Sequence, residues 1–454
     1  MNQTVALPYP YHPPLRLLAT VRDEPFLVFF DGMADASDLS AAEASRQRYS
    51  YLCVKPRHVL EIKTALFGQD PLDELRAALG PLRPTLPDLP PFQGGAAGML
   101  GYELGGCYER VPTRSPDHPW PVLLVGIFDA VLAWDHWQQR SWVIGTPEAV
   151  VALVHRLPIV PPALPSPSQL ITSARPDQSS ASFANRIRQC VDAIHAGDLF
   201  QANLSQRFTA PRPGHLSAFD LYRRLRGRTR APFGGMLQHG ALALLSGSPE
   251  RFLSVDAQGH VETRPIKGTR ARSSDPLKDA ALAEALRRSD KDHAENLMIV
   301  DLLRNDLARS CQVGSVHVPA LCQLESFATV HHLVSEVRGQ LRPELHAVDL
   351  LRAAFPGGSI TGAPKVKAME VIAQLEPTQR GPYCGSLVWI GYDGAMDSNI
   401  LIRTFLMESN RITLQTGGGI TALSDPDSEV EESLIKAAAL RRALETPLPS
   451  SSIE

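Results

Sequence analysis

The chain has 454 residues, 44% of them hydrophobic, which is ample material for a large buried core. Its 45 Lys and Arg residues nearly balance 48 Asp and Glu residues, and the net charge of −3 argues against a dedicated binder of nucleic acid or of anionic membranes. No apolar run is long enough to span a bilayer. Six scattered cysteines without a CxxC pair indicate reduced thiols, so we expect a globular protein of the cytoplasm.

A proline-rich segment divides the chain. Six prolines fall between Pro158 and Pro176, and no apolar period survives there. Because proline has a fixed backbone angle and no amide donor, such a stretch is typical of a surface connector. The sequence therefore predicts an N-terminal region of residues 1–157, a linker of residues 158–181, a second region of residues 182–446 and a flexible tail of residues 447–454.

Both regions mix strands and helices. In the N-terminal region, the apolar runs 25–32 and 122–134 are typical of buried strands. In the second region, apolar residues at helical spacing end at Gly197, which predicts a helix that stops there. The alternation that follows over residues 200–205 predicts a strand whose polar residues, Gln201 among them, share one face.

The last third of the chain carries further elements. Two strands, 387–392 and 399–406, flank the turn signal Asp393-Gly394. Strands and helices come in runs rather than in strict alternation, which favours an α+β fold. Helices are expected over residues 292–307, 364–375 and 426–444.

Two of these helices bring acidic side chains that suit a hard cation. Glu295 lies on the first, whereas Glu429 and Glu432 are three residues apart and share one face of the last. Gathered carboxylates are the ligands that Mg²⁺ prefers. An acidic helix start favoured by the helix dipole explains the same spacing without a metal, so spacing alone leaves both interpretations open.

The segment from Phe355 to Ile372 places a glycine-rich loop before a helix. Free amide groups at such a helix start bind phosphate or carboxylate. The Lys-Ser/Thr pair of a Walker-type loop is missing after Gly362, so nucleotide binding of that kind is not expected. A carboxylate site and a tight loop that only caps the helix both stay open.

Lys267 lies in a basic segment with Arg264, Arg270 and Arg272. Nearby positive charge disfavours an ammonium ion, so a partly buried Lys267 would lose its proton readily and act as a nucleophile. The alternative is an exposed basic loop without a chemical role.

Arg403 falls within a stretch that is typical of a strand apolar on both faces. A guanidinium group there needs an anion or carbonyl groups, because its unpaired burial is costly. A structural ion pair and a substrate carboxylate are both open. Together, these features outline a site for a small carboxylated substrate and a divalent metal.

In this order, the segments resemble the chorismate-utilising enzymes, which include anthranilate synthase component I, aminodeoxychorismate synthase component I, isochorismate synthase and salicylate synthase. The resemblance covers nearly all of the second region, through GDLFQANLSQRF, SPERFL, PIKGTRAR, SDKDHAENLMIVDLLRND, PGGSITGAPKVKAME, NILIRTF, QTGGGI and DPDSEVEES. It implies an α+β fold with a large, mixed, two-layered β-sandwich core flanked by helices, as in anthranilate synthase component I.

Three features resemble the family members that form 4-amino-4-deoxychorismate. Gln201 stands where water-adding members carry a lysine base, and Lys267 stands where anthranilate synthases carry alanine. The loop PGGSITGAPK is also similar to the aminodeoxychorismate version. The resemblance therefore implies aminodeoxychorismate synthase component I activity on the p-aminobenzoate and folate branch. The alternatives are anthranilate synthase component I and a non-catalytic chorismate-binding regulatory subunit.

The resemblance also implies roles for individual residues. Glu295 and Glu432 would hold Mg²⁺ with Glu429 close by, Glu250 would protonate the departing C4 hydroxyl, and Lys267 would attack C2 before ammonia attacks C4. Substrate contacts are implied for Arg403, Tyr383, Gly417, Gly418, Gly419, Ser359, Thr361, Gln201 and His332.

Chorismate and ammonia are the implied substrates. A glutaminase would need a cysteine nucleophile between glycines, and no G-x-C-x-G occurs in the chain. Ammonia is therefore expected from solution or from a separate glutamine amidotransferase subunit, and the resemblance implies such a subunit as the partner. Neither a nucleic acid nor a membrane is expected as a partner.

Overall fold

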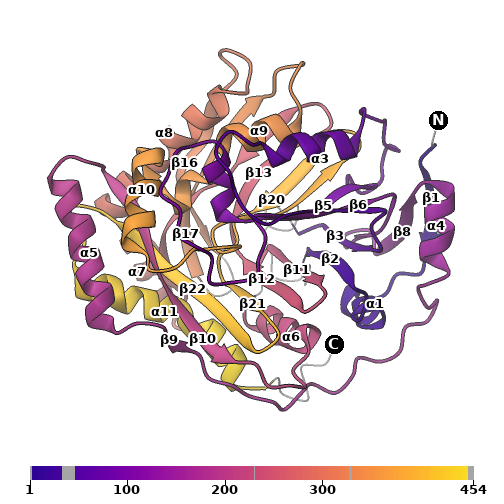
Figure 1. Cartoon of the computed structure of the whole chain (residues 1–454), viewed down its shortest axis with the longest axis horizontal. Helices are drawn as coiled ribbons and strands as arrows, with labels where there is room; N and C mark the ends of the chain where they lie inside the picture. Colours follow the sequence, from indigo (N-terminus) through magenta and orange to yellow (C-terminus); the bar gives the residue numbers. More distant parts are fainter. Residues whose placement is uncertain (1–2, 33–46, 230, 327–329, 448–454) are drawn as a thin grey trace.

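The computed structural model describes residues 3–32, 47–229, 231–326 and 330–447. Two large sheets lie one over the other, and helices cover their outer faces (Figure 1). The helices are α1 Pro14–Val21, α3 Pro71–Leu79, α4 Pro147–Val154, α5 Ser180–His195, α6 Ala218–Thr229, α7 Pro276–Arg287, α8 Asp290–Ala308, α9 Ala347–Ala354, α10 Lys365–Leu375 and α11 Pro426–Glu445, with the short 3₁₀ helices η1 Tyr102–Cys107 and η2 Gly358–Ile360.

Among the described residues, one sheet has 12 strands and the other has 10. The 12-stranded sheet contains β1 Val5–Tyr9, β2 Phe26–Asp31, β3 Tyr49–Val54, β7 Ala130–Asp135, β8 Arg140–Gly145, β9 Arg175–Pro176, β10 Gln201–Pro211, β11 Phe233–His239, β12 Leu242–Ser248, β18 Gly362–Ala363, β21 Thr404–Met407 and β22 Arg411–Ile420. The 10-stranded sheet contains β4 His58–Ile62, β5 Gly95–Leu100, β6 Leu123–Phe128, β13 Arg251–Val255, β14 His260–Thr263, β15 Ile266–Ala271, β16 His317–Ser326, β17 Val330–Gln340, β19 Ser386–Gly391 and β20 Met396–Asn399.

Both sheets are built from both sides of the proline-rich segment. The first has the order β1-β8-β7-β3-β2-β11-β12-β21-β22-β10-β18, so β2 of the N-terminal region pairs with β11 of the second region. The second has the order β15-β17-β14-β13-β20-β19-β5-β6-β4, where β5 and β19 make the same kind of join. The boundary at residue 157 thus divides the sequence but not the sheets.

Three apolar layers hold this sandwich together. Residues of β2 and β3 pack against β5, β6 and β19 to fill the space between the sheets. The outer face of the 10-stranded sheet packs against α3, α8 and α9, and that of the 12-stranded sheet against α1, α4, α6 and α11. Burial of these apolar faces is the main stabilising contribution. The expected α+β sandwich flanked by helices is confirmed.

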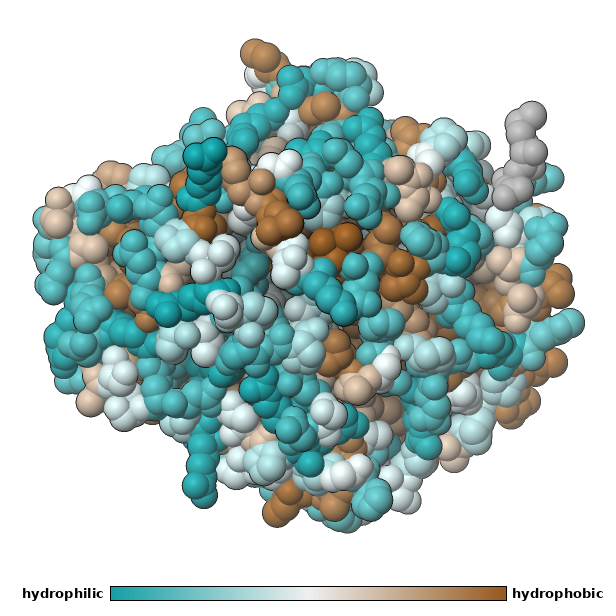
Figure 2. Space-filling model, viewed as in Figure 1, coloured by the Kyte–Doolittle hydropathy of each residue, from teal (hydrophilic) through white to brown (hydrophobic). Residues whose placement is uncertain are grey.

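The surface of the molecule is mostly hydrophilic in the view of Figure 2. Apolar residues gather near the centre of this view. Among the described residues, no helix has the length and apolar character needed to cross a membrane.

The proline-rich segment runs over the surface as an extended connection (Figure 1), with no helix or strand between residues 158 and 174. Its backbone is nevertheless fixed at several points. The carbonyl oxygens of Pro165 and Ser168 accept hydrogen bonds from Arg223 and Arg224 of α6, at 2.8 and 2.6 Å. The expected tail begins at Pro447, and its remaining residues lie outside the described part.

The three helices expected in the last third of the chain are present as α8, α10 and α11, and Gly197 follows α5 with φ +86°. Two predicted strands, however, were too long. The apolar run 122–134 divides at Asp129 into β6 and β7, which belong to different sheets. An apolar pattern cannot show this change of sheet, because both strands are buried on both faces.

The expected strand 399–406 divides in the same way. The partner of β19 across the Asp393-Gly394 turn is β20, whereas β21 joins the other sheet. Arg403 lies in the connection between them, at φ +51°, and not within a strand.

Candidate active site

The predicted site residues gather where both sheets meet the loop around η2. Gln201 lies on β10 and Gly417, Gly418 and Gly419 on β22, in the 12-stranded sheet. Lys267 on β15 and His332 on β17 come from the other sheet. The carboxylates of α8 and α11 complete the group, because Lys267 interacts electrostatically with Glu295 and Glu432.

Lys267 is partly buried and directed at the loop. The strand is bulged at Gly268, whose φ of +81° shifts the register with β17 between Lys267 and Thr269. The Lys267 amine donates a hydrogen bond to the Ser359 carbonyl oxygen at 3.4 Å. Burial lowers the pKa of Lys267, although Glu295 and Glu250 oppose this effect.

The neighbouring arginines are not the main cause of that shift, contrary to the prediction. Arg264 pairs with Glu325 and Glu336. Arg270 lies 3.2 Å from an oxygen of Asp292, and Arg272 lies 2.9 Å from one of Asp279. Each guanidinium charge is therefore balanced locally, and desolvation of the Lys267 amine dominates.

Glu250 lies between β12 and β13 and is only 6% exposed. Burial raises its pKa to about 7, while a hydrogen bond from the Ser359 side chain and the charge of Lys267 act in the opposite direction. A large share of Glu250 therefore keeps its proton near neutral pH. This is the state that a general acid requires.

The loop around η2 presents backbone groups as well as side chains. The Asn203 side-chain amide donates to the Ser359 carbonyl oxygen at 2.5 Å, beside the amine of Lys267. Thr361 is fully buried, and its hydroxyl donates to the Gly357 carbonyl oxygen at 2.9 Å. Ser359 thus faces the acid and the amine, whereas Thr361 fixes the loop conformation.

Gln201 is fully buried, and neither atom of its amide group has a hydrogen-bond partner among the described residues. A β-carbon at Gly419 would lie 2.1 Å from the Gln201 side-chain nitrogen. At Gly417 it would lie 1.9 Å from the Leu204 carbonyl oxygen, and at Gly418 3.0 Å from a carboxylate oxygen of Glu429. The three glycines therefore allow a strand to pass directly beside polar site groups.

Arg403 provides positive charge that no described acidic side chain neutralises through an ion pair, and burial lowers its pKa. His332 is hydrogen-bonded to the Thr269 hydroxyl at 2.9 Å, and burial followed by the charge of Arg403 lowers its pKa to about 4. The imidazole is therefore neutral at pH 7. Tyr383 is buried in the segment before β19. A desolvated guanidinium without a counter-ion suits an anionic ligand.

The three candidate metal ligands approach one another from two helices. Glu295 lies in the second turn of α8, and one of its carboxylate oxygens is buried without a hydrogen-bond partner in the described structure. Lys291 lies 3.9 Å from Glu295 and 3.9 Å from Glu429. Glu432 is paired with Lys436 at 2.6 Å.

These carboxylates fit Mg²⁺ in donor chemistry, because they are oxygen ligands. One buried oxygen of Glu295 has no hydrogen-bond donor among the described residues and lies 3.9 Å from the Lys291 ammonium group. As placed, no group of three or more His, Cys, Asp or Glu side chains in the described ranges is arranged to hold a metal ion. Burial raises the pKa of Glu295 and of Glu429. At Glu432 burial also acts to raise the pKa, but Lys436, Lys291 and Lys267 together outweigh it and the pKa is lowered.

Sequence reasoning missed several residues at this site. Asn203 was assigned only to a strand face, although it fixes the Ser359 carbonyl group. Lys291 and Lys436 were also missed, although each lies four residues from a candidate ligand on the same helix. That i to i+4 spacing of opposite charges was the signal available in the sequence.

The family model described as chorismate binding enzyme matches residues 38–442. The chain belongs to this family. Aminodeoxychorismate synthase component 1 of Klebsiella aerogenes is 40% identical over 419 residues, covering 89% of this chain and 92% of that protein. Anthranilate synthase component 1 of Thermus thermophilus is 38% identical over 426 residues, covering 90% and 91%. Among solved structures, anthranilate synthase component I from Streptococcus pneumoniae matches this chorismate-binding chain with a TM-score of 0.76 and 30% identity, covering 90% of this chain and 98% of the other.

Proposed function

We propose that this chain acts as aminodeoxychorismate synthase component I, which replaces the C4 hydroxyl group of chorismate by an amino group from ammonia. The observation that carries the proposal is the partly buried amine of Lys267, held against the Ser359 carbonyl oxygen and close to the protonatable Glu250. The name of the 40% identical Klebsiella relative supports the same product. Anthranilate synthases, which the chain also resembles, form a different product from chorismate.

The substrate would be held through its carboxylates. Arg403 supplies a guanidinium group that forms no ion pair with the described acidic side chains, which favours binding of an anion. His332 is neutral beside it and therefore adds no second charge. A bound Mg²⁺, held by Glu295 and Glu432 with Glu429 nearby, would neutralise a ring carboxylate and draw electron density from the ring.

Two displacements at the ring account for the residues present. Glu250 donates its proton to the C4 hydroxyl group, which leaves as water while the neutral amine of Lys267 forms a bond to C2. Ammonia then attacks C4, and the C2–N bond to Lys267 breaks as the double bond returns. The proton lost by the incoming nitrogen restores the acid form of Glu250. Net, a hydroxyl group is exchanged for an amino group and one water is formed.

The ammonia is proposed to come from a glutamine amidotransferase subunit. The name of the Klebsiella relative, component 1, implies a second component, and this sequence has no cysteine nucleophile between glycines. We place the reaction in the cytoplasm, because the six cysteines are free and five of them are buried.

The deciding experiment is product analysis. The purified chain is incubated with chorismate, Mg²⁺ and an ammonium salt, and one half of the mixture is then treated with a lyase that releases p-aminobenzoate. We expect p-aminobenzoate only in the treated half. Anthranilate fluorescence in both halves would refute the proposal and favour the anthranilate synthase alternative. Chorismate binding without turnover would instead favour a regulatory subunit.

A further inference from the structure

A buried ion pair lies directly behind the loop that carries Ser359. Arg380 follows α10 and has 2% side-chain exposure, and Glu376 has 6%. The Arg380 guanidinium donates to both carboxylate oxygens of Glu376, at 2.9 and 2.8 Å. Glu376 also accepts hydrogen bonds from the backbone and side chain of Ser205, each at 2.8 Å. The pair therefore fixes one end of α10 to strand β10.

The same guanidinium group holds two other segments of the site. It donates to the Ile360 carbonyl oxygen at 3.0 Å and to the Asn203 carbonyl oxygen at 2.6 Å. Ile360 lies between Ser359 and Thr361, and Asn203 lies two residues after Gln201. The planar, multiply donating guanidinium group suits this arrangement, because it can bind several acceptors in fixed directions.

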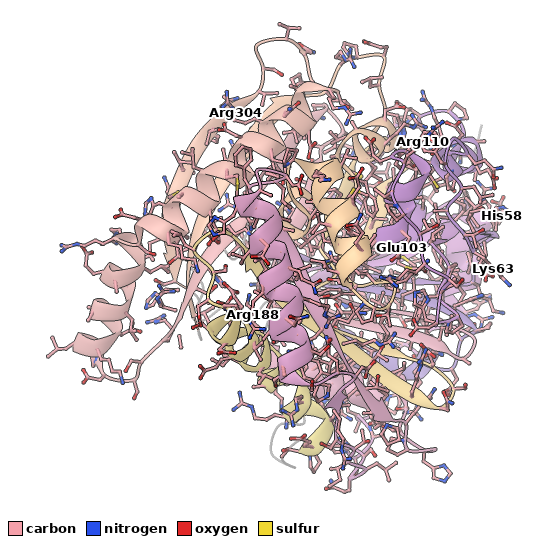
Figure 3. The ribbon with its side chains drawn as sticks, turned by 60° about the vertical axis from the view of Figure 1, so that its left-hand side comes forward. His58, Lys63, Glu103, Arg110, Arg188 and Arg304 are labelled. Atoms are coloured by element: carbon pink, nitrogen blue, oxygen red, sulfur yellow. The ribbon has the colours of Figure 1, made fainter. Side chains whose placement is uncertain are left out.

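A residue of the N-terminal region fixes the backbone that carries Arg380. The Glu103 carboxylate accepts hydrogen bonds from the backbone amides of Arg380 and Gly381, at 2.8 and 3.0 Å. The ring of Tyr102 lies 4.5 Å below the guanidinium group. Figure 3 shows Glu103 beside the orange ribbon of the second region. Tyr383, three residues after Arg380, is positioned by the same short segment.

We infer that Arg380 is a positioning residue for the amination reaction: it sets the relative positions of the Ser359 loop, the Gln201 strand and the Tyr383 segment. This inference rests on the proposed function. The Arg380 guanidinium group donates to Glu376, Ile360 and Asn203, so it acts through the residues it holds. Because Lys267 and Glu250 both engage Ser359, a displacement of the loop changes the geometry of the amine and the acid together.

The test is Arg380→Lys, which keeps the charge but cannot donate to Glu376, Ile360 and Asn203 in the same fixed directions. We expect kcat with chorismate and ammonium to fall by about 10- to 100-fold. The matched control is Arg224→Lys. Arg224 is as buried as Arg380 but lies on α6, far from Arg380 along the chain, and its guanidinium group donates to the Ser168 carbonyl oxygen. The control is expected to lower the melting temperature while kcat stays within twofold of wild type.

A pH profile separates positioning from general destabilisation. In the wild type, a hydrogen bond from the Ser359 side chain lowers the pKa of Glu250. Displacement of the loop breaks this hydrogen bond and should therefore raise that pKa. The charge of Lys267 also lowers the pKa of Glu250, so a shift of the amine away from the acid would act in the same direction. Cys384, which is electrostatically coupled to Glu250, is not substituted in either variant. In Arg380→Lys the alkaline limb of the activity profile should move to higher pH, and in Arg224→Lys it should not.

Activity of Arg380→Lys within twofold of wild type, or parallel losses in both variants, would overturn the inference. If Arg380→Lys does not fold, Glu103→Gln is tested in its place. Glu103 borders a cavity of about 50 Å³, so the substitution can be accommodated. The glutamine amide can accept only one of the two hydrogen bonds that the Arg380 and Gly381 backbone amides donate to Glu103. That variant must then lower kcat at least threefold for the inference to stand. If the wild type forms no amino product, the proposed function fails separately, and chorismate affinity measured by calorimetry on the same variants still tests positioning.

Discussion

Replacement of Glu250 by glutamine should separate catalysis from stability. The carboxyl is buried, and its pKa is raised from 4.5 to about 7, chiefly by desolvation. Below about pH 4 the side chain is protonated in the folded and unfolded chain alike, so ionisation affects neither state. As the pH rises toward 7, the unfolded chain releases this proton while the folded chain retains it, and the wild type loses stability.

The size of that loss follows from the two pKa values. Raising the pKa from 4.5 to about 7 corresponds to roughly 3 kcal/mol at pH 8, where the carboxyl is ionised in both states. Glu250→Gln has no such penalty. Its stability relative to wild type should therefore increase by about 3 kcal/mol between pH 4 and pH 8, while kcat falls by about 10²- to 10⁴-fold as the acid is lost.

Urea unfolding of both proteins at several pH values measures the difference directly. Comparison across pH cancels the pH-independent cost of the lost hydrogen bond from Ser359. Glu344→Gln is the control for the substitution itself, because this side chain is 66% exposed. A change below about 1 kcal/mol between pH 4 and pH 8 would show that Glu250 is not held protonated by burial, and its role as the acid would lose its basis.

Further expected outcomes concern the amine, the metal and the strand of glycines. Lys267→Ala should abolish aminodeoxychorismate formation and the covalent mass gain that we expect on Lys267 with chorismate in the absence of ammonia. Lys267→Arg should restore neither product formation nor the mass gain, whereas Arg270→Ala should retain product formation and the mass gain. Wild-type rates of product formation in Lys267→Ala would contradict the role of Lys267 as the nucleophile. Glu295→Gln and Glu432→Gln should each remove any rise in melting temperature produced by Mg²⁺, and an unchanged rise would exclude these ligands. Gly419→Ala should lower kcat/KM at least tenfold, because its β-carbon would lie 2.1 Å from the side-chain nitrogen of Gln201. Gly214→Ala is the control, since its β-carbon meets no atom within 4 Å, and it should not lower kcat/KM. Equal activity in the two variants would show that Gln201 is free to move.

The sequence predicted secondary structure correctly where that structure is determined by residues close together along the chain. The helices that carry Glu295 and Glu432 were predicted because their apolar spacing and their caps are local properties. The polar face of the strand that starts at Gln201 was predicted from simple alternation, and the Gln201 side chain lies beside Gly419 of β22.

It was uninformative where the sheet partner or the electrostatic environment is set by distant residues. The division of the run 122–134 at Asp129 depends on a change of sheet, and Asp129 accepts a hydrogen bond from Tyr392, 263 residues away. Burial lowers the pKa of Lys267, and the nearby arginines are not the main cause because distant carboxylates pair with them, such as Glu336 with Arg264. Neither relation leaves a periodic pattern in the sequence.

The joining of both sheets across residue 157 has a consequence for how the protein can be cut. Strand β2 is joined to β11 over Phe26–Asp31, and β5 to β19 over Gly95–Leu100, so each region completes the sheets of the other. The connecting segment from 158 to 174 contributes no strand. Hydrolysis of one peptide bond there opens a loop but exposes no apolar sheet face, and loop closure accounts for only a small part of the stability of such a large interface. Fragments 1–160 and 161–454, which keep the contacts of Pro165 and Ser168 with α6, should therefore assemble into a working split enzyme when produced together. Either fragment made alone would present unpaired strand edges and aggregate.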